Sequence, residues 1–355
     1  MNNGRSKLSA QYKTGDLIYR NTSLGAPGPG WLNLSTTQTV YTQSSLGKLL
    51  PQYSFWTTQT SNFTTGIQSV AYGNGIWVAG GAGVGLRTST DTINWNTQTS
   101  NFTTGIMSVA YGNGVWVAGG FGGALRTSTD NAITWNTQTS NFGTSIISSV
   151  AYGNGIWVVV GAGGTLRTST DTVNWNTQTS NFTTGILSVA YGNGIWVAGG
   201  FNGDLRTSTN NGVTWNTQTS QFGTTPIFSV AYENGIWVAG GVLGALRTST
   251  DAINWNTQTS QFGTTGIASV AYGNGIWIAG GQNGVLRTST DNAVTWNTQT
   301  SNFGTSAISS VAYGNSFWVA GGAGGALRTL NVGNSTYTVS PIASIPTGYT
   351  PWIKT

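Results

Sequence analysis

The side chains best suited to bind a polar or anionic ligand are seven arginines that recur every 39 to 41 residues. A guanidinium group offers several N–H donors and stacks on aromatic rings, so the series could form seven equivalent pockets for anionic or neutral sugars. The alternative is structural, with each arginine paired to a nearby aspartate or stacked on a tryptophan. The seven are Arg87, Arg126, Arg167, Arg206, Arg247, Arg287 and Arg328.

The residue types in the chain argue against catalysis. The sequence contains no His and no Cys, which removes the usual nucleophile–base pairs, thiolate ligands and disulfides. Glu233 is the only glutamate, and it stands where the other copies of the repeat have a turn glycine. We therefore expect no catalytic residue, no metal site and no cofactor.

The arginines belong to a unit that occurs seven times. In its first copy, alternating residues at 67–72 lead into an Asn-Gly pair, which favours a tight hairpin. Further strands are expected at 76–79, 86–89 and 95–99. The tyrosine before the Asn-Gly turn recurs with the same period, at Tyr72, Tyr111, Tyr152, Tyr191, Tyr232, Tyr272 and Tyr313.

Four strands in each unit of about 40 residues predict an all-β fold, a seven-bladed β-propeller of four-stranded antiparallel blades. We place the propeller at 55–330, an N-terminal arm at 1–54 and a C-terminal arm at 331–355. A β-solenoid is the competing fold, but its coils have shorter periods and do not need repeated Asn-Gly hairpins. A terminal outer strand should close the ring, and segments at Trp56 and at Tyr337 both qualify.

The net charge of +5 does not belong to the repeats. Their seven arginines are balanced by seven acids, so the excess of positive charge lies in the arms. No basic stripe alternates with stacking aromatic residues, and we expect no nucleic-acid partner. The acids are Asp91, Asp130, Asp171, Asp204, Glu233, Asp251 and Asp291.

No apolar run approaches the roughly 18 residues that a membrane span needs, and the segment after Met1 lacks the apolar core of a signal peptide. We therefore expect no membrane insertion. The predicted location is a virion or the extracellular space after lysis, with the cytoplasm as the alternative.

The turn before the fourth strand carries a recognisable motif. Residues 128–135 read Ser-Thr-Asp-Asn-Ala-Ile-Thr-Trp. This segment resembles the Asp-box of sialidase-type (BNR) propellers, Ser-x-Asp-x-Gly-x-Thr-Trp, with Ala132 in place of the glycine. The copy at 208–215 keeps Gly212 but has Asn210 for the aspartate, and three copies are one residue shorter. We expect the carboxylate to accept backbone N–H groups and the tryptophan to pack between sheets.

The sialidase resemblance also raises the hypothesis of a glycosidase. Those enzymes use a tyrosine nucleophile with a glutamate, a separate aspartic acid and an arginine triad. Here each tyrosine of the repeat recurs in the same sequence context in the other copies, so none stands out as a nucleophile, and most aspartates form turns. The N-terminal arm, with Gly-Asp at 15–16 and Pro-Gly-Trp-Leu at 29–32, resembles the collar-type modules of phage tail and tail-fibre proteins. That second resemblance implies a place in a virion.

Variation among the copies is concentrated on one predicted face. The Asn-Gly and Asp-containing turns fall on one side of a meander, and they are almost the same in every copy. The connections between second and third strands, at 82–85 and its six counterparts, fall on the other side and differ. The residue entering the first strand also varies, as Gln68, Met107, Ser148, Leu187, Phe228, Ala268 and Ser309.

This pattern suggests a scaffold that presents a binding surface, although unconstrained drift of loops is the alternative. The most distinctive connection holds Phe201, Asn202 and Asp204, because an aromatic ring beside an amide and an acid can stack on a sugar and hydrogen-bond to it. The candidate ligand-binding residues, besides the seven arginines, are Phe121, Phe201, Asn202, Asp204, Gln282 and Asn283.

The leading interpretation is a non-enzymatic, lectin-like propeller, a receptor-binding or tail-fibre-associated virion protein. Its partners would be glycans or a glycosylated cell surface, and other virion proteins through the N-terminal arm. Multivalent presentation suits weak sugar sites because linked sites gain avidity. The alternative is a protein-binding scaffold, similar to the Asp-box propellers that assist photosystem assembly, and a glycosidase is the third hypothesis.

Overall fold

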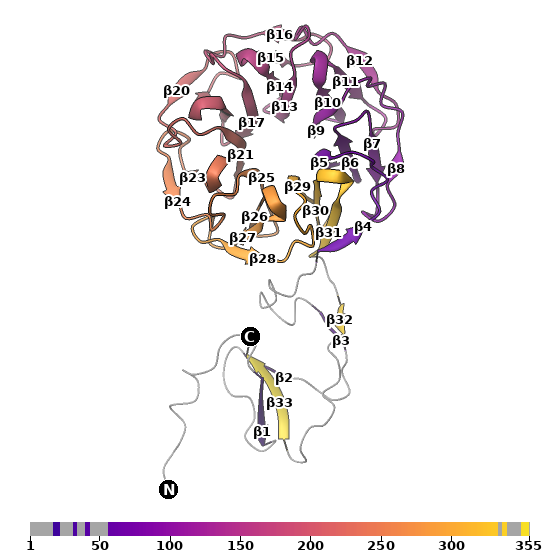
Figure 1. Ribbon diagram of the computed structural model, residues 1–355, viewed down its shortest axis with the longest axis vertical. Helices are drawn as coiled ribbons and strands as arrows, with labels where there is room; N and C mark the ends of the chain where they lie inside the picture. The colour runs from indigo at the N-terminus through magenta and orange to yellow at the C-terminus, as the bar shows by residue number, and fades with distance from the viewer. Residues whose placement is uncertain are drawn as a thin grey trace. The chain divides into compact units, whose positions relative to one another are not determined.

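The computed structural model describes residues 56–332 in full and, outside them, the backbone of strands at 17–21, 31–33, 40–42, 336–338 and 349–354. The chain divides into two compact units, Phe55–Leu330 and a second made of Met1–Ser54 with Asn331–Thr355. The first unit is a ring of seven four-stranded antiparallel sheets (Figure 1). The predicted all-β, seven-bladed propeller is therefore confirmed.

Each blade is a meander whose first strand lies nearest the centre of the ring and whose fourth strand lies at the rim (Figure 1). The innermost strands are β5 (Ile67–Gly73), β9 (Ile106–Gly112), β13 (Ile147–Gly153), β17 (Ile186–Gly192), β21 (Ile227–Glu233), β25 (Ile267–Gly273) and β29 (Ile308–Gly314). They begin blades 1 to 7 in that order. The second strands are β6 (Ile76–Gly81), β10 (Val115–Gly120), β14 (Ile156–Gly161), β18 (Ile195–Gly200), β22 (Ile236–Gly241), β26 (Ile276–Gly281) and β30 (Phe317–Gly322).

The outer half of each blade is shorter. The third strands are β7 (Leu86–Ser89), β11 (Leu125–Ser128), β15 (Leu166–Ser169), β19 (Leu205–Ser208), β23 (Leu246–Ser249), β27 (Leu286–Ser289) and β31 (Leu327–Asn331). The outer strands are β8 (Asn96–Thr97), β12 (Asn136–Gln138), β16 (Asn176–Thr177), β20 (Asn216–Gln218), β24 (Asn256–Gln258), β28 (Asn297–Gln299) and, in blade 7, β4 (Thr57–Gln59).

The first hairpin of each blade forms because its two turn residues tolerate positive φ. In blade 1, Gly73 pairs directly with Ile76, and Asn74 and Gly75 between them have φ of 47° and 80°. Two consecutive left-handed residues define the tight turn that matches the twist of a β-hairpin. The predicted Asn-Gly turn is therefore present.

Neighbouring blades approach closely at two positions of the repeat, each of which is glycine in six of the seven copies; the exceptions are Val160 in blade 3 and Glu233 in blade 5. A Cβ added to Gly80 would lie 2.6 Å from Cγ2 of Ile106, and one added to Gly73 would lie 2.3 Å from the ring of Tyr111. Both partners belong to β9 of the next blade. Apolar side chains such as Trp77 and Trp116 are buried beside these contacts. The core is thus distributed around the ring, one layer between each pair of blades.

The turn between third and fourth strands, here called the Asp-turn, is held by its carboxylate. Oδ1 of Asp91 accepts the N–H groups of Ile93 and Asn94 at 2.9 and 2.8 Å. The indole N–H of Trp95 donates to the carbonyl of Thr92 at 3.0 Å, and its ring is buried. These contacts match the structural role expected of the motif. Its relation to the Asp-box of sialidases stays a prediction.

The N-terminal segment completes blade 7. Strand β4 pairs antiparallel with β31, with Thr58 opposite Arg328. Trp56 is buried, and its carbonyl accepts the amide of Asn302 at 2.6 Å, as the carbonyl of Trp95 accepts that of Asn62 in blade 1. The alternative segment, which contains Tyr337, pairs elsewhere. The outer edge of blade 7 is therefore occupied from the N-terminal side.

The second unit joins the two ends of the chain. Strands β1 (Leu17–Asn21), β33 (Tyr349–Lys354) and β2 (Trp31–Asn33) form one sheet in the order β1-β33-β2, and β3 (Val40–Thr42) pairs with β32 (Thr336–Thr338). The Gly-Asp and Pro-Gly residues that suggested a collar-type module lie outside the described residues, so that resemblance stays a prediction. Within the described part of the chain, no helix is long and apolar enough to cross a membrane.

Replacing Trp56 tests the closure of the ring. We expect Trp56→Ala to lower the free energy of unfolding by about 3–5 kcal/mol, since it empties a buried site at the end of blade 7. Trp95→Ala in blade 1 should cost a similar amount, whereas Tyr337→Ala should change stability by less than about 0.5 kcal/mol. Chemical denaturation measures all three, and a large effect of Tyr337→Ala with none of Trp56→Ala would contradict the closure.

The Asp-turns predict a loss of stability in acid. The N–H of Asn94 lowers the pKa of Asp91 to about 2, and the hydroxyl of Thr134 does the same for Asp130. Because an unfolded aspartate titrates near pH 3.9, this stabilisation is complete above about pH 4 and is lost as the pH falls through 2.

A matched variant already exists within the chain, since Asn210 takes the place of the aspartate in blade 4 and accepts the N–H of Thr214 at 2.9 Å. The double variant Asp91→Asn, Asp130→Asn should lose less of its melting temperature between pH 4 and pH 2 than the wild type loses. Parallel curves would show that these carboxylates do not govern acid stability.

Candidate functional site

The two variable connections of each blade lie together on one face. We call the connection between second and third strands the tip, and the segment from one outer strand to the next innermost strand the entry loop. The tip N–H groups of Ala82 and Phe121 donate to the entry-loop carbonyls of Gly66 and Gly105, at 2.7 and 3.0 Å. Together the tips and entry loops form what we call the tip face.

The two invariant turns meet at the other end of the blades. The amide of Asn74, in the Asn-Gly turn of blade 1, donates to the side-chain oxygen of Asn131, in the Asp-turn of blade 2, at 3.3 Å. The contact agrees with the predicted division into an invariant and a variable face. We call the invariant side the turn face.

Six of the tips are single 3-10 turns whose second residue has positive φ, from 55° at Leu243 and Asn283 to 65° at Gly122. The third residue is a glycine packed against the next entry loop, because a Cβ on Gly203 would lie 2.1 Å from the carbonyl oxygen of Gly223. The backbone of the turn is thereby fixed, while the side chains at the first, second and fourth tip positions vary. These turns are η4 (Phe121–Gly123), η5 (Ala162–Gly164), η6 (Phe201–Gly203), η7 (Val242–Gly244), η8 (Gln282–Gly284) and η9 (Ala323–Gly325).

Four tips expose a large apolar side chain. The exposed fractions are 51% for Val84, 37% for Phe121, 42% for Phe201 and 63% for Leu243. The candidate residues predicted from the sequence include the two phenylalanines but not the valine or the leucine. The aliphatic residues were missed because the prediction looked for aromatic and polar side chains that could bind a sugar.

The variable residue at the start of each innermost strand is a β-bulge. In blade 1, Ile67 pairs with Gly81 and Ser69 with Gly80, so Gln68 between them has no partner in the ladder. A bulge frees its residue from the ladder and redirects its side chain. The same shift occurs in every blade, and all seven bulged residues are half-buried. This explains why a position within a strand varies as freely as a loop.

With the exception of Arg206 in blade 4, the arginines make neither of the contacts that the structural alternative predicted, an aspartate pair or a tryptophan stack. Each guanidinium carbon lies 4.8 to 5.3 Å from the ring centre of a phenylalanine in the entry loop of the same blade. The expected stacking on tryptophan is therefore wrong, because the entry loop places a phenylalanine over the third strand, and the expected repeated aspartate pair is wrong because within residues 56–332 blade 4 alone has it. The phenylalanines are Phe63, Phe102, Phe142, Phe182, Phe222, Phe262 and Phe303.

Each guanidinium outside blade 4 donates to at least two carbonyl groups of the protein. Nε and Nη2 of Arg247 donate to the carbonyl of Gln221 at 3.0 and 2.6 Å, and Nη1 donates to that of Leu246 at 3.0 Å. Desolvation by burial lowers the pKa of Arg247. These arginines tie the entry loops to the third strands, and their predicted role as sugar pockets stays a prediction.

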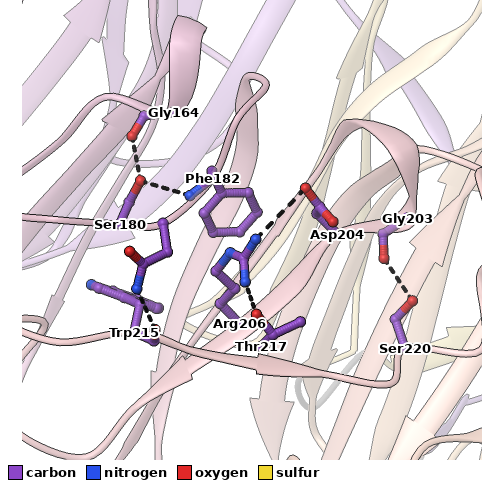
Figure 2. A network of polar contacts seen from close by, with 10 residues as sticks. Gly164, Ser180, Phe182, Gly203, Asp204, Arg206, Trp215, Thr217 and Ser220 are labelled. Atoms are coloured by element: carbon purple, nitrogen blue, oxygen red, sulfur yellow. Dashed lines mark hydrogen bonds and ion pairs between the residues drawn. The ribbon is translucent and has the colours of Figure 1, made fainter.

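Blade 4 departs from this arrangement (Figure 2). Arg206 is the most buried of the seven arginines; it lies over the ring of Phe182 and donates to the hydroxyl of Thr217. Its Nη2 lies 4.0 Å from a carboxylate oxygen of Asp204, the ion pair found within residues 56–332. The donation to the entry-loop carbonyl that the other six arginines make is replaced by these contacts. The guanidinium of Arg206 therefore lies near the carboxylate of its own tip instead of donating to the entry-loop carbonyl.

The remaining predicted residues are exposed but separate. Asn202 lies beside Phe201 at the tip of blade 4, and Gln282 with Asn283 forms the tip of blade 6. Phe121 belongs to blade 2. The structure thus distributes the candidates over three blades rather than gathering them around one pocket. Residues 56–332 also contain no group of three His, Cys, Asp or Glu side chains that could hold a metal ion.

The ring defines the class of protein, a seven-bladed β-propeller. Several solved structures are similar to this chain. YCF48 from Cyanidioschyzon merolae is 16% identical with a TM-score of 0.64, covering 78% of this chain and 98% of that one. A structure of YCF48 bound to D1 peptide is 15% identical with a TM-score of 0.65, covering 78% and 94%. The computationally designed protein Ika8 is 12% identical with a TM-score of 0.59, covering 78% and 98%.

At these identities the similarity shows the fold alone. Neither the protein-family models nor the curated proteins include a match to this chain.

The contacts of Arg247 predict a contribution to stability. Arg247→Met keeps most of the aliphatic packing but removes three hydrogen bonds and the charge over Phe222. We expect the free energy of unfolding to fall by about 1–2 kcal/mol. Chemical denaturation tests this, and unchanged stability would mean that the guanidinium is free for a ligand.

Proposed function

We propose that this chain is a non-enzymatic, protein-binding propeller whose tip face holds an extended segment of a partner protein. The observation that carries this proposal is the exposure of Val84, Phe121, Phe201 and Leu243 at positions where otherwise near-identical blades differ. The turn face also exposes aliphatic side chains, Ile93 and its five counterparts, but these recur in each Asp-turn, whereas the apolar residues of the tip face differ from blade to blade and include two aromatic rings. Aromatic residues are enriched in protein interfaces.

The rigidity of the tip face supports the same function. The tips are held by backbone hydrogen bonds to the entry loops. The hydroxyl of the serine at the start of each entry loop also donates to a tip carbonyl. For example, the hydroxyl of Ser220 donates to the carbonyl of Gly203 at 2.6 Å. A surface that is ordered before binding loses little conformational entropy when a partner binds.

The comparisons add support to the protein-binding interpretation. One of the similar structures is a complex of YCF48 with D1 peptide, so a propeller of this kind is compatible with a peptide ligand. The alternative from the sequence analysis, a protein-binding scaffold, therefore becomes our first choice. The virion location rests on the resemblance of the N-terminal arm and stays a prediction, as does the absence of catalysis.

Carbohydrate binding is the second candidate, and the tip of blade 4 favours it. Phe201 exposes part of its ring beside the amide of Asn202, and Asp204 is fixed by Arg206. A ring for stacking with two polar groups next to it suits a single sugar unit. A site at one tip would be monovalent, unlike the seven pockets first considered.

A displayed library of random peptides, selected against the full chain, tests the proposal. We expect peptides to be enriched by the wild type and to bind at least about tenfold more weakly to the double variant Phe121→Ala, Phe201→Ala, if each ring contributes about 1 kcal/mol or more. Alanine is the residue that blades 3 and 7 carry at this position, as Ala162 and Ala323, so the fold should tolerate it.

The matched control changes exposed residues of the turn face, as Ile93→Thr with Ile133→Thr. Equal loss of binding in this control would locate the interface on the wrong face. A glycan array with the same proteins separates the second candidate: sugar binding that depends on Phe201, without any enriched peptide, would replace our proposal.

A further inference from the structure

Leu243, at the tip of blade 5, has a backbone conformation that leucine rarely adopts. Its φ and ψ are 55° and 33°, in the left-handed region. There the Cβ of an L-residue is crowded by the following carbonyl, so glycine and asparagine are preferred. Five other tips have those residues with positive φ at the same position: Gly122, Gly163, Asn202, Asn283 and Gly324. The chain thus provides its own comparison, and blade 5 alone places leucine there.

Nothing within the propeller offsets this strain. Leu243 is 63% exposed, the largest exposed fraction among the large hydrophobic residues of the part described in full. Two unfavourable terms, a strained backbone and an apolar side chain in water, therefore remain in the free protein. Other residues with positive φ that are neither Gly nor Asn are buried in the Asp-turns, as Thr92 is, or are polar, as Gln221 is. Leu243 differs from them in exposing an apolar side chain, and such strain at an exposed position points to a contact that the free protein lacks.

The surroundings of Leu243 are also unusual among the blades. The N–H of Val242 donates to the carbonyl of Pro226 at 3.2 Å, which ties the tip to the entry loop. Phe228, two residues beyond Pro226, is the bulged and half-buried residue of β21. We call these four residues the blade 5 patch.

Blade 5 alone has a large apolar side chain at all four positions. The other blades have small or polar residues at two or more of them, such as Gly185 and Asn202 in blade 4 or Ala268 and Gln282 in blade 6. No charged side chain belongs to the patch. Its complement is therefore an uncharged apolar group, because a charged one would be desolvated without a partner.

We propose that the blade 5 patch is the main contact of the tip face and that Leu243 is its anchor, covered by a large apolar side chain of an extended peptide. This inference rests on the proposed function and names the chemistry of its ligand. With this left-handed backbone the side chain of Leu243 is exposed to solvent, where a partner can cover it. The seven near-identical copies would then present one strong contact rather than seven equal ones.

Stability of the free protein tests the strain. Leu243→Asn introduces the residue found in blades 4 and 6, and we expect it to raise the melting temperature by about 2 °C. Leu243→Ala is the matched control, because alanine keeps the unfavourable backbone and should not give this rise. A melting temperature that does not rise in Leu243→Asn would contradict the strain on which the inference depends.

Binding tests the anchor, with the enriched library peptides as probes and calorimetry as the measurement. Leu243→Asn should weaken their binding at least about tenfold. Ile253→Thr changes another exposed aliphatic residue of the same blade, on the turn face, and should leave the affinity within about twofold. The dissociation constant should also change little between low and high salt, since no ion pair is involved.

The outcomes separate the two proposals. If peptides bind and Leu243→Asn does not weaken them, this inference fails and the proposed function stands. If no peptide is enriched, the proposed function fails first, whatever the melting temperatures show. If the wild type is a dimer that Leu243→Asn dissociates, a second copy of the chain covers the patch, and the peptide as occupant is wrong.

Discussion

The close approach of each blade to the next is the constraint on which the rest of this structure depends. Ile106 and Tyr111 of one blade fit against Gly80 and Gly73 of its neighbour, with no room for a Cβ. The same contact recurs in most of the ring, and six of the seven copies keep glycine at each of the two positions. The exceptions are Val160, at the Gly80 position of blade 3, and Glu233, at the Gly73 position of blade 5, where burial raises the pKa of the glutamate. This constraint accounts for the recurrence of the isoleucine, the tyrosine and the glycines at these positions in most copies.

The variable residues of the tip face lie outside these close contacts between blades. The first two tip residues and the bulged residue lie outside the strand ladders and outside the contacts between blades at Gly73 and Gly80, so they can differ without disturbing the ring. The invariant parts then act as a frame: the Asp-turn fixes the outer strand, and the arginine holds the entry loop against the third strand through Phe63 and its counterparts. A rigid frame with a variable surface is suited to recognition.

Much of the fold could be predicted from the sequence because its signals are local. Hairpins and blades are indicated by the Asn-Gly pair, the aspartate of the Asp-turn and the repeat period. Contacts between residues far apart in the sequence could not be predicted from these local signals. Trp56 and Tyr337 looked equivalent as closing segments, and only strand pairing distinguishes them. The phenylalanine partners of the arginines were missed because alternation along a strand does not reveal the path of a loop. Leu243 was missed because its unusual feature is a positive backbone φ, which the sequence alone does not show.

The central claim is that ligand recognition belongs to the tip face while the rest of the ring is a frame. Hydrogen–deuterium exchange of the full chain, with and without an enriched peptide, tests it most directly. We predict added protection at the tips and the bulged residues, strongest at 242–245, and none at the Asn-Gly turns or Asp-turns. Protection confined to the turn face, or spread evenly over all blades, would contradict the account.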